Sequence, residues 1–152
     1  MNYWLIKSEP DCYSIDDLKK DRVTPWNGVR NYQARNFMRD SMKIGDMALF
    51  YHSSTKIPGV YGVTKVASDP HPDASAFNTK DEHYDPKSKK ENPTWICIDF
   101  SFLKKLTRPV TLQAIKKDHK LKGMMVAQKG SRLSIQPVSK SHFERIIDLG
   151  NT

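Results

Sequence analysis

The sequence predicts an α+β fold, a mostly antiparallel barrel of five or six strands with short helices at its edges. Strand-forming runs recur along the chain and short capped helices separate them, without a regular βαβ alternation or an internal repeat. With 152 residues, of which 38% are hydrophobic, the chain has the size of one domain that buries its core without metal or disulfide bonds. We therefore expect residues 1–152 to form a single domain.

The N-terminal part of the chain predicts a strand followed by a short helix. Residues 3–7 are rich in strand formers and lead into a Ser-Glu-Pro loop at residues 8–10. Ser14 and Asp17 then have the spacing of a capping box, in which each side chain accepts a hydrogen bond from the other residue's backbone. This spacing indicates that a helix begins directly after Ser14.

The stretch of residues 25–36, PWNGVRNYQARN, combines a turn with a helix start. Its Asn27-Gly28 pair favours a tight turn, and Asn31 is a good N-cap residue for the helix that follows. Trp26 must lie where the turn directs it, either as a core anchor or as an exposed stacking surface. The residues of this stretch leave both roles open.

The middle of the chain predicts a hairpin and a long excursion. Residues 47–52 and 59–67 have the composition and alternation of two antiparallel strands joined by an open loop. Residues 68–93, named the excursion below, contain four prolines, many charges and few aliphatic side chains. We expect the excursion to run over the surface, with Phe77 and Tyr84 as its anchors.

The longest strand is expected at residues 95–106. Alternate side chains of a strand lie on opposite faces, and here one face consists largely of aliphatic and aromatic residues. We expect this face to lie in the core; its members are Ile96, Ile98, Phe100 and Phe102.

The C-terminal part predicts a helix, a strand and a final helix. Thr111 suits the N-cap of the first helix, and residues 133–138 have the composition of a last strand. Ser141 and Glu144 have the spacing of a second capping box, and Gly150 is placed to end the helix that it opens.

Composition favours a nucleic acid as the partner. Lys and Arg total 25 against 17 Asp and Glu, which gives a net charge of +8 and attracts polyanions such as DNA or RNA.

Cys12 and Cys97 lack the CxxC spacing of redox and metal sites, so we expect free thiols. No run of eighteen apolar residues occurs, and the first residues lack the basic region and the small-residue cleavage site typical of a signal peptide. We expect a cytoplasmic monomer, or a nuclear one in a eukaryotic cell, that is neither secreted nor bound to a membrane.

The sequence shows no convincing catalytic or metal-binding pattern. The five histidines lack metal-site spacing, and no nucleophile elbow, HExxH, Walker or dinucleotide-binding pattern occurs. We therefore expect no enzyme activity, no cofactor and no metal. Two alternatives stay open: an enzyme for a small nucleotide-like molecule, with Glu9 or His52 as the base, and a protein-interaction module whose basic face only aids solubility.

The chain does contain the groups that a base-binding pocket needs. A base turned out of its stack can be held by an aromatic side chain, by hydrogen bonds to its edge and by contacts to the flanking phosphates. Trp26 could supply the stacking surface, and Asn31 and Ser53 could bind the base edge. Asn31 could instead serve only as a cap, and His52 only as a core histidine. The basic residues that could meet phosphates are Arg30, Arg35, Lys129 and Arg132.

Six motifs closely resemble the EVE domain family: YWLIKSEP, WNGVRNYQARNFMR, GDMALFYHSS, PGVYGVTKV, YDPKSKKENPTWICIDF and GSRLSIQPV. The resemblance runs from Asn2 to about Leu149. It implies a PUA-like pseudo-barrel, related to the PUA, ASCH and YTH domains, with a pocket for a modified base and no catalytic activity of its own. In this family the pocket is linked to modified cytosine in DNA or to modified RNA.

The resemblance also implies which residues form the site. The base pocket is expected to contain Ser8, Glu9, Trp26, Arg30, Asn31, His52, Ser53, Arg132, Leu133 and Ser134. Apart from the resemblance, the positive charge of Lys7, Arg35 and Lys129 leads us to expect these residues at a phosphate-binding rim. The pocket and rim residues come from four separate segments, which must therefore meet in space.

Overall fold

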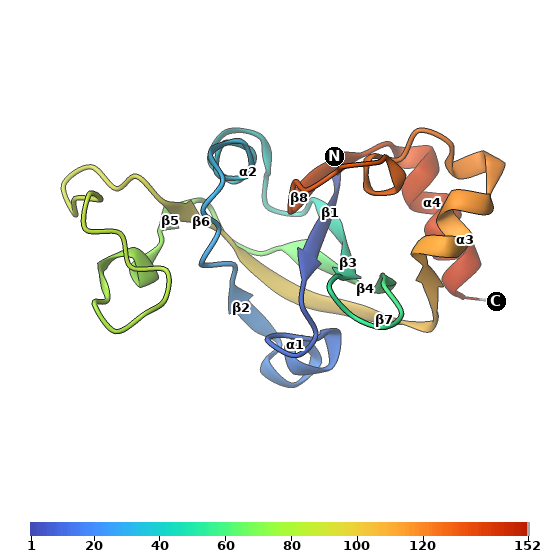
Figure 1. The fold of residues 1–152 in the computed structure, drawn as a ribbon, viewed down its shortest axis with the longest axis horizontal. Helices are drawn as coiled ribbons and strands as arrows, with labels where there is room; N and C mark the ends of the chain where they lie inside the picture. The colour runs from blue at the N-terminus through green and yellow to red at the C-terminus, as the bar shows by residue number, and fades with distance from the viewer. Residues whose placement is uncertain (152) are drawn as a thin grey trace.

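A computed structural model describes residues 1–151; Thr152, the last residue of the predicted domain, lies outside the described residues. Within residues 1–151, six strands form one curled half-barrel sheet in the order β2-β7-β4-β3-β1-β8 (Figure 1). The pair β1–β3 is parallel, and the other neighbours in this sheet are antiparallel. The strands are β1 (Tyr3–Ser8), β2 (Val23–Pro25), β3 (Met47–His52), β4 (Gly59–Val66), β7 (Asp99–Thr111) and β8 (Ile135–Val138). The predicted α+β, mostly antiparallel architecture is confirmed.

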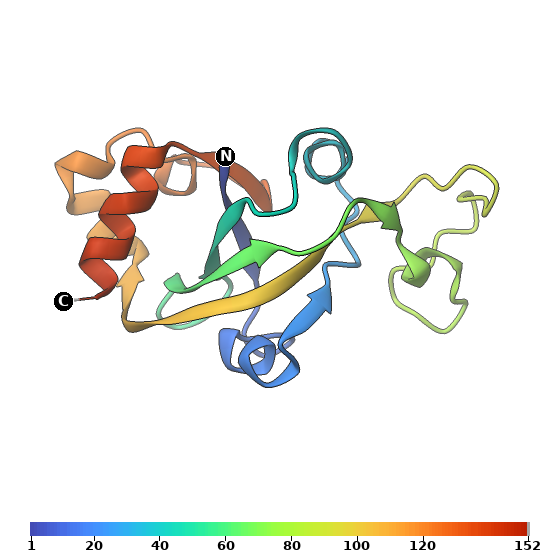
Figure 2. The same ribbon diagram turned by 180° about the vertical axis from the view of Figure 1, so that it is seen from behind.

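Short helices surround the sheet. The helices α3 and α4 lie at one end of the molecule and the excursion at the other, with the long strand β7 running between them (Figure 2). No helix within residues 1–151 has the length and apolar character needed to cross a bilayer. The α-helices are α1 (Ile15–Asp21), α2 (Tyr32–Asn36), α3 (Leu112–Lys117) and α4 (Lys140–Gly150), and a π-helical turn, Phe37–Ser41, continues α2.

Three predicted helix starts are confirmed. Ser14 and Asp17 form the capping box of α1, with the Asp17 carboxylate accepting from the Ser14 backbone N–H at 2.8 Å. The Asn31 Oδ1 accepts from the backbone N–H of Ala34 at 3.0 Å at the start of α2. Thr111 caps α3 in the same way. These caps are local in sequence, which is why the spacing alone predicts them.

The predicted cap of the final helix is wrong. Ser139, rather than Ser141, caps α4, and its Oγ accepts from the backbone N–H of His142 at 3.2 Å. Ser139 follows the end of β8 in an extended conformation, so its side chain can reach the first turn of the helix. Gly150 belongs to the last turn of α4, and Asn151 follows it as the C-cap.

The sheet carries a hydrophobic cluster on each face. Because successive strand residues point to opposite faces, Ile6 of β1 packs in a cluster with Trp26, whereas Leu5 packs in a second cluster with Tyr51. In β7, the predicted core residue Phe100 is fully buried, as is Ile98 just before it. The first cluster lies beneath the turn that contains Trp26.

The predicted strand at residues 95–106 is divided. Its first part is β6 (Ile96–Cys97), which pairs with β5 (His71–Pro72) in a separate small sheet, and its second part is β7. β7 extends to Thr111, beyond the predicted end. The long-range pairing of β6 with the excursion accounts for the break, and no local pattern in the sequence indicates it.

The excursion is held by residues other than the predicted anchors. Tyr84 is exposed and Phe77 is only partly buried. Instead Asp73 is almost fully buried, and Trp95, just beyond the excursion, donates its indole N–H to Asp85 at 2.8 Å. Polar contacts, rather than aromatic burial within residues 68–93, therefore fix this segment.

Candidate functional site

A cavity of about 550 Å³ opens where β1 ends. We name it the tryptophan cavity; its lining comes from residues 7–13, 24–30 and 82–83 and from Ser134. The first two segments surround the loops after β1 and β2, and residues 82–83 belong to the excursion. Its volume lies in the range of sites that bind small molecules, about 300–1,000 Å³.

Trp26 is both a core residue and a wall of this cavity. Its side chain is packed edge-on against Phe50 and Phe100, with ring centroids 5.6 and 5.5 Å apart, and it is 9% exposed. Its backbone N–H donates to the Ile98 carbonyl at 2.8 Å. The two roles that the sequence leaves open are thus compatible, because the packing that buries most of the indole also fixes the part that lines the cavity.

The turn after Trp26 depends on a glycine. Gly28 has a φ of +81°, a conformation that residues with a Cβ rarely adopt, and its N–H donates to the Asp73 carboxylate at 2.8 Å. A Cβ at Gly28 would lie 2.7 Å from Cε1 of the His83 ring. The absence of a side chain at Gly28 therefore allows His83 of the excursion to lie against the turn at the edge of the cavity.

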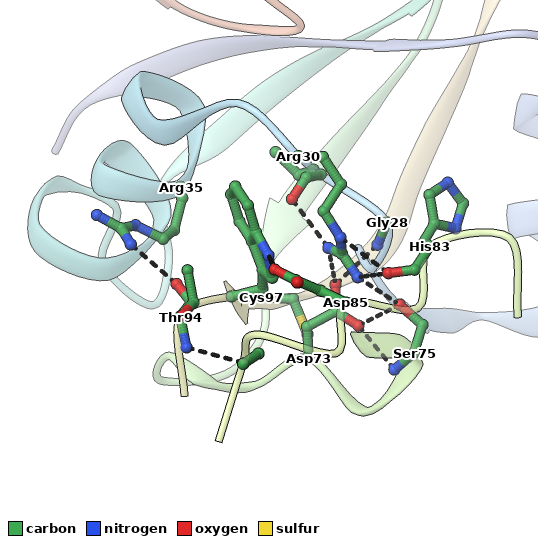
Figure 3. A network of polar contacts seen from close by, with 12 residues as sticks. Gly28, Arg30, Arg35, Asp73, Ser75, His83, Asp85, Thr94 and Cys97 are labelled. Atoms are coloured by element: carbon green, nitrogen blue, oxygen red, sulfur yellow. Dashed lines mark hydrogen bonds and ion pairs between the residues drawn. The ribbon is translucent and has the colours of Figure 1, made fainter. Parts of the chain in front are cut away.

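Arg30 joins the excursion to this turn (Figure 3). Its guanidinium donates to the Asp73 carboxylate at 3.0 Å, to the Ser75 hydroxyl at 3.1 Å, to the His83 carbonyl at 2.8 and 3.1 Å, and to the Val29 carbonyl at 3.0 Å. A guanidinium has five N–H donors, and these five hydrogen bonds use all of them. A ligand can therefore gain a hydrogen bond from Arg30 only if one of these contacts breaks.

The carboxylate of Asp73 is the centre of this network. Burial alone would raise the pKa of Asp73, but hydrogen bonds from Ser75, Arg30 and the Gly28 N–H outweigh it and hold the pKa below its ordinary value. Asp73 is therefore an anion that is 1% exposed and neutralised by Arg30. Such a pair fixes the geometry of the excursion relative to the turn.

The structure brings together some of the predicted site residues. Lys7, Ser8, Glu9, Trp26, Arg30 and Ser134 all line the tryptophan cavity. They come from three of the four predicted segments. Their contacts with a ligand stay a prediction.

His52 lies elsewhere than expected. It does not line the tryptophan cavity; its Nε2 accepts a hydrogen bond from the Ile15 N–H at 3.2 Å, and its ring stacks on Tyr61 at 4.1 Å. Burial is the main cause that lowers the pKa of His52. The last residue of β3 thus faces the start of α1, which makes it a structural histidine at this position.

Other predicted residues also lie outside this cavity. The Asn31 Oδ1 is occupied by its capping contact, and Arg35 donates to the Thr94 carbonyl at 2.9 Å. Ser53 and Lys129 line a second cavity on the other side of β1. Arg132 is exposed, and Leu133 packs against the first hydrophobic cluster.

The cavity is also lined by nine residues that were not predicted as site residues: Cys12, Tyr13, Thr24, Pro25, Asn27, Gly28, Val29, Glu82 and His83. Pro25 and Asn27 flank Trp26 in the sequence, so closeness to Trp26 is a usable signal for these two residues. No pattern in the sequence indicates Glu82 and His83, because their placement depends on the contact between Arg30 and Asp73, which are 43 residues apart.

A cysteine, a histidine and an aspartate meet outside the cavity, but they lack an accessible nucleophile. The Cys97 Sγ is 3.7 Å from Nδ1 of His71, whose Nε2 lies 2.8 Å from the Asp99 carboxylate. Burial and nearby carboxylates raise the pKa of Cys97 to about 12, so the thiol stays protonated at neutral pH. Among residues 1–151, no cluster of three or more His, Cys, Asp or Glu side chains could hold a metal ion.

The chain is similar to a known family over nearly its whole length. The family model of the EVE domain matches residues 2–149. Thymocyte nuclear protein 1 of Gallus gallus is 42% identical over 97% of this chain and 68% of its own length. The human protein of that name is 40% identical, over 97% of this chain and 73% of its own length.

Solved structures show the same fold. The human THYN1 protein in complex with 5-methylcytosine-containing DNA is 38% identical, with a TM-score of 0.93 over 100% of this chain and 99% of that one. A protein from Pseudomonas syringae is 40% identical, with a TM-score of 0.92 over 97% of this chain and 98% of that one. A YTH domain of Zygosaccharomyces rouxii, 14% identical with a TM-score of 0.57, shares the fold alone. The predicted PUA-like fold is confirmed.

Proposed function

Because this chain belongs to the EVE domain family, we propose that it binds a nucleic acid with a modified cytosine and accommodates that base in the tryptophan cavity. The observation that carries the proposal is an aromatic-walled cavity in a chain that is 38% identical to human THYN1, whose structure contains 5-methylcytosine DNA. No group of the site is assigned a catalytic role, and binding without turnover is part of the proposal.

A base can enter the cavity only if it leaves its stack in the nucleic acid. Unstacking the base costs a few kcal/mol of free energy, and stacking on one aromatic side chain stabilises the bound base by about 1–3 kcal/mol. The remaining stabilisation must come from hydrogen bonds to the base edge and from apolar contact. Trp26, Pro25 and Val29 provide the apolar part of the lining. A buried methyl group there contributes about 1–3 kcal/mol to selectivity, a preference of roughly tenfold or more.

The polar lining suits the edge of cytosine. The exocyclic amine of cytosine is a donor and pairs well with a carboxylate. Glu9 is an exposed carboxylate on the cavity wall, so we propose that it accepts a hydrogen bond from this amine. Asn27 and Ser134 add groups that can either donate or accept; Ser8 Oγ already donates to the Tyr13 carbonyl at 2.5 Å and retains acceptor capacity.

Matched oligonucleotides test the proposal. The wild-type protein is titrated with DNA and RNA of one sequence that contain either cytosine or 5-methylcytosine, at two salt concentrations, with fluorescence anisotropy as the signal. We expect a preference of about tenfold for the methylated form in at least one nucleic acid. Equal affinity for the methylated and unmodified forms of both nucleic acids overturns the proposal.

A pair of glutamate variants tests the assignment of Glu9. In Glu9→Ala we expect affinity for the methylated oligonucleotide to fall about tenfold, while the salt-sensitive affinity for unmodified DNA does not fall, because a negative charge is removed. Glu91→Ala removes another exposed carboxylate, which does not line the cavity, and is the control. If both variants behave alike, Glu9 does not bind the base.

An enzyme that acts on a nucleotide-like molecule would need a base in the cavity. Of the two candidate bases, Glu9 lines the cavity and His52 lies outside it. Incubation of the pure protein with free 5-methylcytidine and with the methylated oligonucleotide, followed by mass spectrometry, tests this alternative. We expect the substrates to be recovered unchanged. A product that disappears in Glu9→Ala would contradict the proposal of binding without turnover.

A further inference from the structure

A second cavity, of about 460 Å³, lies next to the tryptophan cavity. We name it the lysine cavity; the polar side chains that line it include Lys7, Ser53, Ser54, Lys116, Lys129 and Ser131. None of the residues within 1–151 that line it is an aspartate or a glutamate. The tryptophan cavity, in contrast, has Glu9 and Glu82 on its wall beside its basic residues. The lysine cavity is therefore the more electropositive of the two.

The lysines of this cavity are available to a ligand. Within residues 1–151, neither Lys116 nor Lys129 has an acidic side chain in ion-pair range, and both are exposed. The Lys7 ammonium has one contact, with the Ser131 carbonyl at 3.4 Å, and burial lowers the pKa of Lys7. An anion in the cavity would thus meet positive charges that no carboxylate of the described chain neutralises.

Lys7 connects the two cavities. It lines both of them, because it lies at the end of β1 beside β3, where the Ser53 N–H donates to the Ser8 carbonyl at 2.9 Å. Strand alternation places Lys7 on the face of Leu5 and Ser8 on the face of Ile6. The two cavities therefore flank one end of the sheet on opposite faces, and Lys7 is the residue that their linings share.

The positive surface continues beyond the lysine cavity. A groove of about 380 Å³ shares Pro58, Leu112 and Lys116 with it and adds Lys56. None of the residues within 1–151 that line this groove is acidic. Going outward from the tryptophan cavity, the lining thus presents Lys7, then Lys129 and Lys116, and then Lys56, an arrangement that suits a linear polyanion better than a single small anion.

We propose that the lysine cavity binds the phosphodiester backbone of the strand whose base occupies the tryptophan cavity. The strand passes around the end of β1 at Lys7 and continues toward α3, where Lys116 and Lys129 contact consecutive phosphates. This inference rests on the proposed function, in which the ligand is a nucleic acid, and adds a second binding site for the same strand. Backbone contacts fix the position of a nucleic acid without selecting its sequence, whereas contacts to the base select the modification.

Two double variants test the proposal. Lys116→Ala with Lys129→Ala removes two lysines of the cavity and leaves Lys7 intact. Lys117→Ala with Lys122→Ala is the control, because it removes the same charge from exposed neighbours that line none of the three cavities. Affinity for unmodified and methylated single-stranded DNA is measured over a series of salt concentrations, and thermal melting confirms that both variants fold.

The slope of log affinity against log salt is the decisive quantity. Each phosphate contact contributes about 0.7 to this slope for a single strand, so we expect the cavity variant to lose about 1.4 and the control close to zero. The ratio of methylated to unmodified affinity should stay at its wild-type value. Equal slopes for the two variants overturn the proposal.

The outcomes separate this proposal from the proposed function. If the wild-type protein shows no preference for the methylated strand but the cavity variant alone loses slope, the base-binding proposal fails and the backbone site stands. If the preference is present but the slopes are equal, the backbone site fails and base binding stands. If the wild-type protein binds neither strand in a salt-dependent manner, both are overturned.

Discussion

Arg30 and Asp73, 43 residues apart in the chain, form an ion pair with 3.0 Å between Nη1 and Oδ2. The pair joins the Trp26 turn to the excursion, and Asp73 also accepts from the Gly28 N–H. The shape of one wall of the tryptophan cavity therefore depends on a segment that is remote in sequence.

Replacement of Asp73 should destabilise the protein. Asp73→Ala leaves the mostly buried Arg30 without its counter-charge and removes a partner of Gly28 and of Ser75, so we expect the free energy of unfolding to fall by about 3 kcal/mol. Urea unfolding measures this change. Asp40→Ala, which breaks the exposed Arg39–Asp40 pair, should cost less than about 1 kcal/mol. Equal costs for the two variants would show that the Arg30–Asp73 pair has no structural role.

A methyl group at Gly28 should lower the free energy of unfolding more than a methyl group at another glycine of similar conformation. Gly28→Ala and Gly45→Ala both place a Cβ at positive φ, which costs about 1–3 kcal/mol, but only Gly28 also meets a ring, that of His83. We expect a larger loss of unfolding free energy for Gly28→Ala, measured by urea unfolding. His83→Ala in the same chain should remove the difference. If the difference persists in the double variant, the ring is not its cause.

Stability should depend on the protonation of His52. Burial lowers the pKa of His52 in the folded state, so the unfolded chain takes up a proton first as the pH falls from about 6.5. The contribution of His52 is therefore complete above pH 6.5 and is lost as the pH falls through the lowered pKa, by at most about 1.4 kcal/mol per pH unit. Urea unfolding between pH 7.5 and 5.5 should show this loss in the wild type and in His119→Gln, but a smaller one in His52→Gln. The same pH dependence in all three would exclude His52 as its source.

The two thiols should differ in reactivity. Cys12 is exposed, although slight desolvation and the Glu9 carboxylate raise its pKa, whereas Cys97 is buried with a pKa of about 12. At pH 8 we expect iodoacetamide to modify Cys12 slowly and Cys97 only after denaturation, as mass spectrometry of the peptides would show. Because Cys12 lines the tryptophan cavity, the methylated oligonucleotide should protect it. Rapid modification of Cys97 in the native protein would contradict the buried position.

Features encoded by neighbouring residues could be predicted from the sequence. The caps at Ser14 and Asn31 depend on spacings of three residues, and the turn at Gly28 depends on one dipeptide. The same reasoning fails for the N-cap of α4. Ser139 and Ser141 are both suitable residues, and the choice between them depends on where β8 ends.

Features that depend on tertiary packing could not be predicted. A histidine at the end of a strand can face a ligand or a helix, and only the position of α1 shows that His52 binds the Ile15 N–H. The approach of His83 to Gly28 likewise follows from the fold of the excursion rather than from any motif. The resemblance to the family indicated the region of the cavity, and long-range contacts determined which side chains line it.

The position of β1 between β3 and β8 has a consequence for how the protein folds during synthesis. The first strand pairs with residues 47–52, but its second neighbour begins only at Ile135. Sheets built on such distant pairings form slowly, since a long chain must close before the contacts stabilise it. The contact between the Lys7 N–H and the Ser134 carbonyl, at 2.9 Å, can therefore form only after the residues between them have been synthesised, so the tryptophan cavity is completed late in the synthesis of this domain.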